Sequence, residues 1–212
     1  TVEPLDAVRF ISNHSSGRQG HAIAAALVKR GARVTLVSGP VNIPDPLGVA
    51  MVHVGTAEQM LAACEAALPA DIAICTAAVA DWRAREWVKG KIKKRPGDTA
   101  APTLSLIQNP DILAQLSSHS QRPGLVIGFA TETDNLEANA CEKLKRKGCD
   151  WILANAVSTD ESDGTVFGNA QNKVLLMTGN GQEDWPLMPK TELADRLVQR
   201  IIHTIGAVNA ES

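Results

Sequence analysis

A short polar segment that precedes a helical pattern has the composition of an anion-binding loop. Residues 12–20 read SNHSSGRQG. Small residues let a backbone approach an anion closely, and a helix that begins in such a segment offers N–H groups and a favourable dipole. The hydroxyl groups of Ser15 and Ser16 would add donors, and Gly17 would leave the backbone accessible. The segment indicates phosphate or nucleotide binding, although a capped turn with packing glycines would have the same composition.

Asn13 of this segment lies where the preceding strand is expected to end, and its amide can both donate and accept hydrogen bonds. We interpret His14 as a surface residue of the loop rather than as a base. The spacing is SSGxxG, and Gly-Lys-Ser or Gly-Lys-Thr does not occur in the chain. The segment therefore matches neither the dinucleotide-binding GxGxxG sequence nor a Walker A loop.

The most concentrated charge in the chain is a basic run at residues 83–95. Seven of the 21 Lys and Arg residues occupy these 13 positions, against the single acid Glu86. The run follows an apolar strand pattern and contains Gly90, as expected of a mobile basic flap that closes over phosphates and excludes water. A solvated charged loop explains the run equally well. Nonspecific RNA binding is less favoured, because no aromatic ladder accompanies the charges.

Two further loops combine small and polar residues. Residues 76–81 read TAAVAD and would leave room for a flat ligand. Asp81 could accept a hydrogen bond from a ribose hydroxyl, a base or an amine, or it could cap a turn. Residues 109–112 read NPDI and predict a helix with Asn109 as its N-cap and Pro110 as its first residue. The backbone of this second loop could also recognise the edge of a nucleobase.

Basic residues end the helical pattern that runs from Asn135 to Lys147. Lys145 and Arg146 would interact favourably with the dipole of such a helix. Lys143 and Lys147 are four residues apart and share a face, so two ammonium groups could contact one phosphate chain. Dipole stabilisation alone would also explain their presence.

The composition excludes several classes of protein. The chain has 212 residues, 44% of them hydrophobic and 21% charged, with 21 basic and 23 acidic residues and a net charge of −2. These values exclude intrinsic disorder and disfavour a general nucleic-acid binder. The sequence contains no apolar stretch long enough for a transmembrane helix, and it opens without a signal peptide. We expect an excised or processed chain, because it begins with Thr1 rather than Met.

The cysteines indicate a reducing compartment. No CxxC occurs, and the spacing fits no metal knuckle. We expect reduced, mostly buried thiols in a cytoplasmic protein. The members of this set are Cys64, Cys75, Cys141 and Cys149.

Strand and helix patterns alternate along the chain. Strands are predicted at 8–11, 33–37, 52–54, 72–78, 103–107, 125–129 and 151–154, and a hairpin at 173–177 and 184–187. Helices are predicted at 22–28, 56–68, from 110, at 135–147 and at 192–205, and a loop at 81–101. The fold class is α/β, with a Rossmann-like, open, mostly parallel sheet, helices on both faces and an antiparallel hairpin at the C-terminal end. We expect a single domain over residues 1–212, with a flexible basic flap at about 82–101 and a ligand at the carboxyl ends of the strands.

Hydride transfer with NAD(P) is the main competing function, because this fold would suit a dinucleotide. The missing GxGxxG sequence and the absence of an acid after the second strand, where residues 38–40 read SGP, argue against it. No GxSxG or HExxH sequence occurs, and the five histidines are scattered, which disfavours a His-based metal site. The residues favour a protein that binds a phosphorylated ligand or nucleotide.

Seven segments that occur in order resemble a known family. They are RFISNHSSGRQG at 9–20, VSGP at 37–40, AAVAD at 77–81, KIKK at 91–94, NPDI at 109–112, GFATET at 128–133 and NAV at 155–157. On these segments the chain resembles the phosphopantothenate–cysteine ligase (phosphopantothenoylcysteine synthetase) domain of bacterial coenzyme A biosynthesis.

The resemblance implies a reaction with CTP and Mg²⁺. CTP would activate the carboxylate of 4′-phosphopantothenate as an acyl-cytidylate and release pyrophosphate. The amine of L-cysteine would then attack the acyl carbon and release CMP. The family also implies a cytoplasmic homodimer fused to a flavin-dependent decarboxylase domain, with no nucleic-acid or membrane partner. We expect the hairpin near Lys173–Leu187 to form part of the dimer contact.

The resemblance also assigns roles to individual residues. Asn13 would handle the acyl-cytidylate, and Lys91 would serve the first half-reaction. Arg9 and Ala78 would join Asn13, Ser15, Ser16 and Gly17 around the phosphopantothenate. No metal ligands are assigned. The CTP-contacting positions would be Cys75, Thr76, Ala77, Asp81, Lys91, Pro110, Asp111, Ile112, Leu113, Phe129, Lys143 and Lys147.

Overall fold

A five-stranded mixed sheet forms the centre of the protein. The computed structural model describes residues 1–93, 103–132, 134–156 and 171–210, with side chains omitted for 156 and 207–210. The strand order is β11-β10-β9-β8-β5. In chain order the strands are β5 (Ile72–Cys75), β8 (Leu125–Glu132), β9 (Trp151–Ala156), β10 (Gln171–Thr178) and β11 (Gly181–Pro189).

The sheet is parallel at one side and antiparallel at the other. β5 and β9 both run parallel to β8, with Ile127 opposite Ile74 and Trp151. β10 runs antiparallel to β9 and to β11, so the predicted hairpin is confirmed as the sheet edge. The carboxyl ends of β5 and β8 therefore meet at one edge, where a ligand site is expected in α/β sheets.

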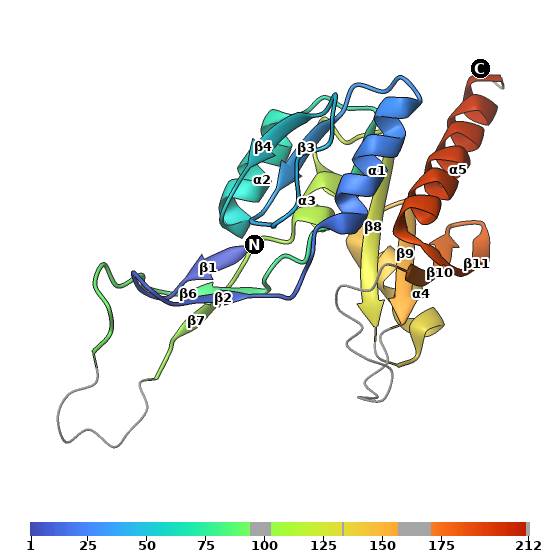
Figure 1. Ribbon diagram of the computed structural model, residues 1–212. Helices are drawn as coiled ribbons and strands as arrows, with labels where there is room; N and C mark the ends of the chain where they lie inside the picture. The colour runs from blue at the N-terminus through green and yellow to red at the C-terminus, as the bar shows by residue number, and fades with distance from the viewer. Residues whose placement is uncertain (94–102, 133, 157–170, 211–212) are drawn as a thin grey trace.

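Helices cover both faces of this sheet, as the sequence predicts (Figure 1). Successive residues of β8 point to opposite faces, so Leu125 and Ile127 join one buried cluster and Val126 joins the other. The first cluster includes residues of α1 (Arg18–Lys29) and α5 (Lys190–Ala210). The second includes residues of α3 (Ile112–Ser118) and α4 (Leu136–Lys147).

A smaller unit packs beside the sheet. β3 (Thr35–Ser38) and β4 (Ala50–His53) pair in parallel. The helix α2 (Ala57–Ala66) begins with the capping box that the sequence predicts, in which Thr56 accepts from the backbone N–H of Gln59. Met60 of α2 packs against Ile112 and Leu116 of α3.

The four remaining strands form an arm that projects from the body (Figure 1). β1 (Val2–Pro4) pairs antiparallel with β2 (Phe10–Ser12), and β6 (Trp82–Ala84) pairs antiparallel with β7 (Leu106–Gln108). The strand predicted at 8–11 therefore lies outside the central sheet. The prediction of a loop over residues 81–101 is wrong at its start, where β6 forms. The three residues of β6 are too few to show the alternating pattern of a strand, but they pair with β7. Residues 94–102 of the expected flap lie outside the described residues.

Gly128 lets α3 pack closely on the central strand. A Cβ atom at this position would lie 2.5 Å from Leu113 Cδ2 and 2.8 Å from Ile152 Cδ1. Both neighbours are buried, so neither can move freely away. The close approach sets the distance between β8 and the first turn of α3, which belongs to one of the predicted binding loops.

We expect Gly128→Ala to lower the free energy of unfolding by about 1–3 kcal/mol, because an added methyl group overpacks a filled core. The measurement is chemical denaturation followed by circular dichroism. Gly179→Ala is the matched control, since a Cβ there would meet nothing within 4 Å. Equal stability of the two variants would contradict the packing argument.

Candidate functional site

The predicted anion-binding loop lies beside the end of β5. Gly20 faces Thr76 so closely that a Cβ on the glycine would lie 2.7 Å from Thr76 Oγ1. Asn13 Nδ2 donates to the carbonyl oxygen of Val79 at 3.0 Å. The structure therefore brings the loop at 12–20 together with the loop at 76–81, as expected for groups at the carboxyl edge of the sheet.

The first helix begins at this edge without a side-chain cap. Its N-cap residue is Gly17, which has a φ of 70°, a left-handed conformation that favours glycine. No side chain caps the helix within the described part of the chain. The Ser15 hydroxyl accepts from the backbone N–H of Gly17 at 3.3 Å. An uncapped helix N-terminus bordered by exposed Asn13 and Ser15 can accept an anion.

The prediction that Asn109 caps α3 is wrong, because Asn109 joins two loops instead. The N-cap is Asp111, whose carboxylate accepts from the backbone N–H of Ala114 at 3.1 Å. Both residues favour N-caps. The helix begins at Ile112, so Pro110, which was predicted as its first residue, lies outside it. Asn109 is buried instead, and its Nδ2 donates to the Ala80 carbonyl at 2.7 Å.

Further hydrogen bonds join the loops at 76–81 and 109–113. We call the whole set, together with the Asn109–Ala80 bond, the latch. The backbone N–H of Asn109 donates to the Asp81 carbonyl at 2.8 Å. Arg83 Nη1 donates to Asn109 Oδ1 at 3.1 Å, and Arg83 Nη2 pairs with Glu58 of α2 at 2.8 Å. The Glu58–Arg83–Asn109 chain holds the two loops in a fixed relation. The sequence reasoning missed Glu58, which is separated from Arg83 by 25 positions without a local pattern between them.

The two lysines of α4 lie next to the same loops. Lys147 forms an ion pair with Asp111. Burial lowers the pKa of Lys143, while Glu132 and Asp81 oppose this change and Lys147 adds to it. A partly desolvated ammonium group gains most from a nearby anion, because the anion restores its charged form. The lysines, Asp81 and Asp111 thus form one electrostatic cluster.

Several predicted CTP positions can contribute only backbone or shape. Ile112 and Leu113 are buried, and Phe129 packs against the core of the sheet. Burial raises the pKa of the Cys75 thiol to about 12, so this group is neutral at physiological pH.

Other predicted positions are accessible. Pro110 is half-buried, whereas Ala77 and Asp81 are exposed. Ala78 offers its carbonyl oxygen, which accepts from the amino group of Thr1 at 3.3 Å.

The cysteines are free, as predicted, but less buried than predicted. Only Cys149 is buried, and the other three are half-buried. Burial raises the pKa of Cys64 and of Cys149 to about 11. These two thiols, like Cys75, are therefore poor nucleophiles at neutral pH.

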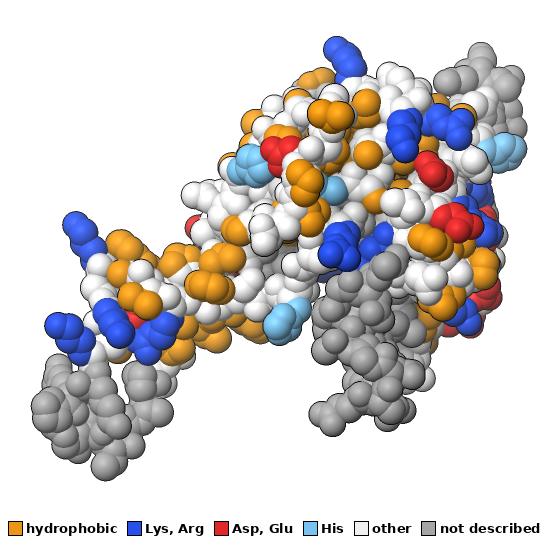
Figure 2. Space-filling view, viewed as in Figure 1, with side chains coloured by type: hydrophobic (Ala, Val, Ile, Leu, Met, Phe, Trp, Pro, Cys, Tyr) orange, Lys and Arg blue, Asp and Glu red, His pale blue; other side chains and the backbone are white. Residues whose placement is uncertain are grey.

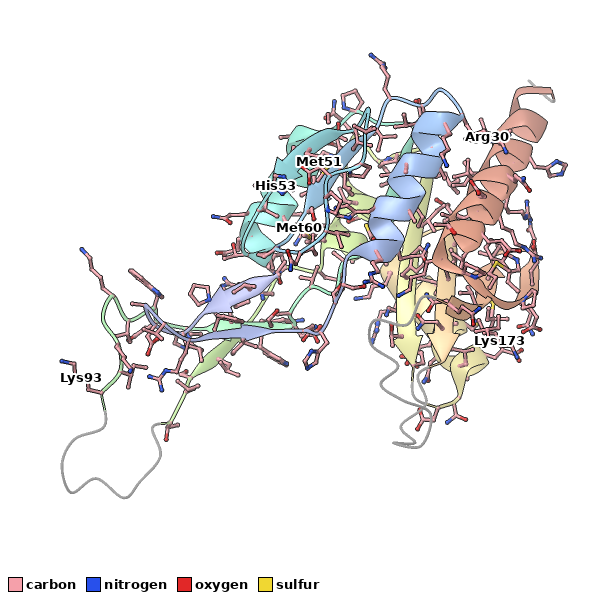
Figure 3. All side chains as sticks on the ribbon, viewed as in Figure 1. Arg30, Met51, His53, Met60, Lys93 and Lys173 are labelled. Carbon is pink, nitrogen blue, oxygen red and sulfur yellow. The ribbon has the colours of Figure 1, made fainter. Side chains whose placement is uncertain are left out.

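The structure does not place Arg9 in the anion-binding loop. Arg9 lies on the arm, where its Nη2 pairs with Asp6 Oδ2 at 2.6 Å and donates to the Ile92 carbonyl at 3.1 Å. Lys91 is exposed on the same arm. Figure 3 shows Lys93 at the far end of the described arm, away from the body of the protein. Lys94 and Arg95 of the basic run lie outside the described residues.

Two cavities lie beside these elements rather than in the cluster. One of about 580 Å³ is lined by Leu136, Cys141, Met177 and neighbouring residues, at the end of α4 opposite Lys147. The other, of about 430 Å³, is lined by Glu58, Glu65 and Arg83 and by residues 108–110. Its two carboxylates outnumber the single guanidinium group, so the open edge formed by the loops is the better candidate for an anion site.

The described residues offer neither a metal-binding cluster nor a membrane-spanning helix. They contain no cluster of three or more His, Cys, Asp and Glu residues arranged to hold a metal ion. None of the helices in the described ranges combines the length and apolar character needed to cross a membrane.

The fold is that of an α/β protein, and the loop predicted to bind an anion lies with two lysines near the carboxyl edge of its sheet. The chain belongs to the family described as "DNA/pantothenate metabolism flavoprotein C-terminal domain", which matches residues 1–205. The resemblance inferred from the seven sequence segments is thereby confirmed at the level of the family.

Relatives and solved structures agree with this assignment. The chain is 44% identical over 203 residues to the coenzyme A biosynthesis bifunctional protein CoaBC of Haemophilus influenzae, covering 95% of this chain and 49% of that protein. It thus spans about half the length of the curated relatives it matches. A crystal structure of the C-terminal domain of CoaBC matches with a TM-score of 0.79 and 34% identity, covering 98% of this chain and 92% of that one.

A more distant structure has the same fold. It is a Cab2 mutant in complex with phosphopantothenate-cysteine, with a TM-score of 0.74 and 16% identity, covering 100% of this chain and 86% of the Cab2 chain. At this identity the likeness supports the fold alone. The α/β class, the helices on both faces and the mixed sheet are thus shared by the solved relatives.

We expect Asn109→Ala to lower the free energy of unfolding by about 1–3 kcal/mol, because the Ala80 carbonyl and the Arg83 guanidinium would lose a buried partner. Thermal and chemical denaturation would measure the loss. Asn42→Ala is the control, since Asn42 is exposed in a loop, and its change should stay within about 0.5 kcal/mol. An Asn109→Ala protein as stable as the control would show that the latch does not hold the loops.

Proposed function

We propose that the chain is a CTP-dependent phosphopantothenate–cysteine ligase domain acting in coenzyme A biosynthesis. It would join 4′-phosphopantothenate to L-cysteine through an acyl-cytidylate, with release of pyrophosphate and CMP. The observation that carries the proposal is the meeting of Asn13 and the uncapped start of α1 with the loop that follows β5. The family membership and the CoaBC relatives support the same activity.

The chemistry of the proposed reaction requires positioning and charge neutralisation. A carboxylate is a poor electrophile, and its conversion to an acyl-cytidylate supplies a good leaving group. Holding the two anions close together then contributes most of the acceleration. The hydrogen bond from Asn13 to Val79 fixes the Asn13 amide at the strand end, where the acyl group would lie in this proposal.

The nucleotide would lie across the two latched loops and the lysines of α4. Lys143 and Lys147 would contact the triphosphate, and the loop at 109–113 would contact the cytidine through its backbone. The half-buried state of Lys143 supports this role, because a phosphate would compensate for its desolvation. The choice of CTP over ATP follows from the family and not from these contacts.

Magnesium fits this arrangement without a protein cage. Mg²⁺ usually keeps several waters and is bound through substrate phosphates and one or two carboxylates. The exposed carboxylate of Asp81, next to the lysine cluster, is the residue we propose to face such an ion. Bound Mg²⁺ would neutralise charge on the pyrophosphate that leaves.

We also propose that the protein forms a homodimer through its arm rather than through the hairpin expected from the sequence. The arm exposes large apolar side chains, and Figure 2 shows orange atoms along much of its visible face. Exposed apolar patches of this kind mark interaction sites. Hairpin strand β11 exposes one large apolar residue, Leu187. The exposed residues of the arm are Val8, Phe10, Trp82, Trp87, Val88, Leu104 and Leu106.

The remaining parts of the proposal concern the parent protein. Because the CoaBC relatives are about twice as long and are called bifunctional, we propose that the chain is fused to a flavin-dependent decarboxylase domain. A cytoplasmic location is part of the same proposal.

The proposed activity predicts CTP-dependent release of pyrophosphate from CTP and 4′-phosphopantothenate, without a need for cysteine. Lys91→Gln should slow this step on the order of 100-fold or more, because the positive group proposed to stabilise the transferring phosphate is lost. Asn13→Asp should let the acyl-cytidylate accumulate, as chromatography of quenched reactions would detect. Lys29→Gln, an exposed lysine at the end of α1 opposite the predicted anion-binding loop, is the control and should stay near the wild-type rate.

A wild-type protein that binds NAD(P) and releases no pyrophosphate from CTP would contradict the ligase assignment. That result would favour a dinucleotide-binding module with a solvated basic loop instead.

The proposed dimer predicts that charge on the arm causes dissociation. Phe10→Asp and Trp82→Asp each replace an apolar side chain, 59% and 52% exposed, with a carboxylate. Sedimentation velocity should show that these variants shift from dimer to monomer. Leu187→Asp is matched in exposure, at 63%, and should leave the dimer intact. Dissociation by Leu187→Asp alone would assign the contact to the hairpin.

A further inference from the structure

Asp6 is a buried carboxylate in the outer part of the arm, away from the body of the protein (Figure 1). Its side chain is fully shielded from solvent, and it lies in the turn that joins β1 to β2. A buried charge is tolerated only where partners compensate for the lost hydration. The hydrogen-bond partners of Asp6 therefore show which parts of the arm its carboxylate holds together.

One carboxylate oxygen of Asp6 closes its own turn. Oδ1 accepts from the backbone N–H groups of Val8 and Arg9, both at 2.8 Å. The backbone N–H of Leu5 donates to the Arg9 carbonyl, also at 2.8 Å. These local bonds follow the usual behaviour of Asp in turns, and they hold Arg9 in place above the carboxylate.

The other oxygen reaches a segment 86 positions away in the sequence. Asp6 Oδ2 accepts from the backbone N–H of Ile92 at 3.0 Å, and from Arg9 Nε and Nη2 at 3.0 and 2.6 Å. Arg9 Nη2 also donates to the Ile92 carbonyl at 3.1 Å. The ion pair therefore holds both the N–H and the C=O group of Ile92, the residue that follows Lys91.

A third contact anchors the segment before Lys91. Val88 forms a parallel bridge with Asp6, and its N–H donates to the Leu5 carbonyl at 3.5 Å. Lys91 thus lies between two points, Val88 and Ile92, that are both tied to the turn at Leu5–Arg9. The guanidinium of Arg9 and the three backbone N–H groups keep the pKa of Asp6 well below its ordinary range, so the anchor stays charged at physiological pH.

We propose that Asp6 is a positioning residue, which acts by holding the peptide of Ile92 and thereby setting where the exposed ammonium group of Lys91 can reach. This inference rests on the proposed ligase function, in which Lys91 serves the first half-reaction. Asp6 itself would contact neither substrate nor nucleotide. A flexible lysine gains catalytic value only when its backbone has a fixed place, because misplacement by about 1 Å costs on the order of 100-fold in rate.

The test measures pyrophosphate release from CTP and 4′-phosphopantothenate in the absence of cysteine. Asp6→Asn retains the size of the side chain but loses the ion pair with Arg9, and the rate should fall on the order of 100-fold. Ile92→Pro leaves Asp6 and its turn unchanged, removes the N–H that Asp6 holds and also restricts the backbone of Lys91, so it should reduce the same rate. Asp45→Asn breaks an exposed contact with His53 and is the matched control.

A double-mutant cycle separates positioning from general damage to the structure. If Asp6 acts through Lys91, Asp6→Asn should have little further effect on the residual rate of a Lys91→Gln protein, measured at high enzyme concentration. Equal losses in both backgrounds would overturn the inference, as would wild-type rates in Asp6→Asn and Ile92→Pro. A wild-type protein without CTP-dependent pyrophosphate release would overturn the proposed function itself, and the inference with it.

Discussion

Burial of β8 on both faces is the constraint on which the rest of the structure depends. A strand with apolar residues on each side must be covered twice, so α1 and α5 pack on one face and α3 and α4 on the other. Because β5 and β8 pair in parallel under these layers, their carboxyl ends lie at the same edge. The start of α1, the loop before α3 and the lysines of α4 all reach that edge, because each helix packs against the strands beside them. The site is a consequence of how the sheet is covered.

Much of the fold could be predicted because its signals are local. The buried strands are continuous apolar runs, α2 has a capping box, and the hairpin turns at Asn180-Gly181 between two strands. The helix α4 ends where Gly148 follows a basic turn, with the glycine in the left-handed conformation that such ends favour. In these elements the preference of the residues and the tertiary structure agree.

The predictions that the structure contradicts concern residues whose partners are distant. Asn109 and Asp111 both favour an N-cap, and local preference could not decide between them. The burial of Asn109 against Ala80 decides it. β6 was hidden because three residues show no period and pair with a strand more than twenty positions later. Arg9 was predicted to lie around the phosphopantothenate with residues 13–17. Its guanidinium group instead pairs with Asp6 and donates to the Ile92 carbonyl. An acid three residues before an arginine, in a turn between two strands, is the signal that could have found the pair.

Burial of the Cys75 thiol has a consequence for how such a protein tolerates its chemical surroundings. A ligase that consumes free cysteine, as we propose this chain to be, works in a solution of small thiols and their disulfides, which exchange with any accessible protein thiolate. With its pKa raised to about 12, the Cys75 thiol stays un-ionised at neutral pH. Its sulfur can therefore line the end of β5 without forming a mixed disulfide with the amino acid proposed to react nearby. Cysteine is small enough for the end of β5, and the packing that buries its thiol group there also keeps the thiol unreactive.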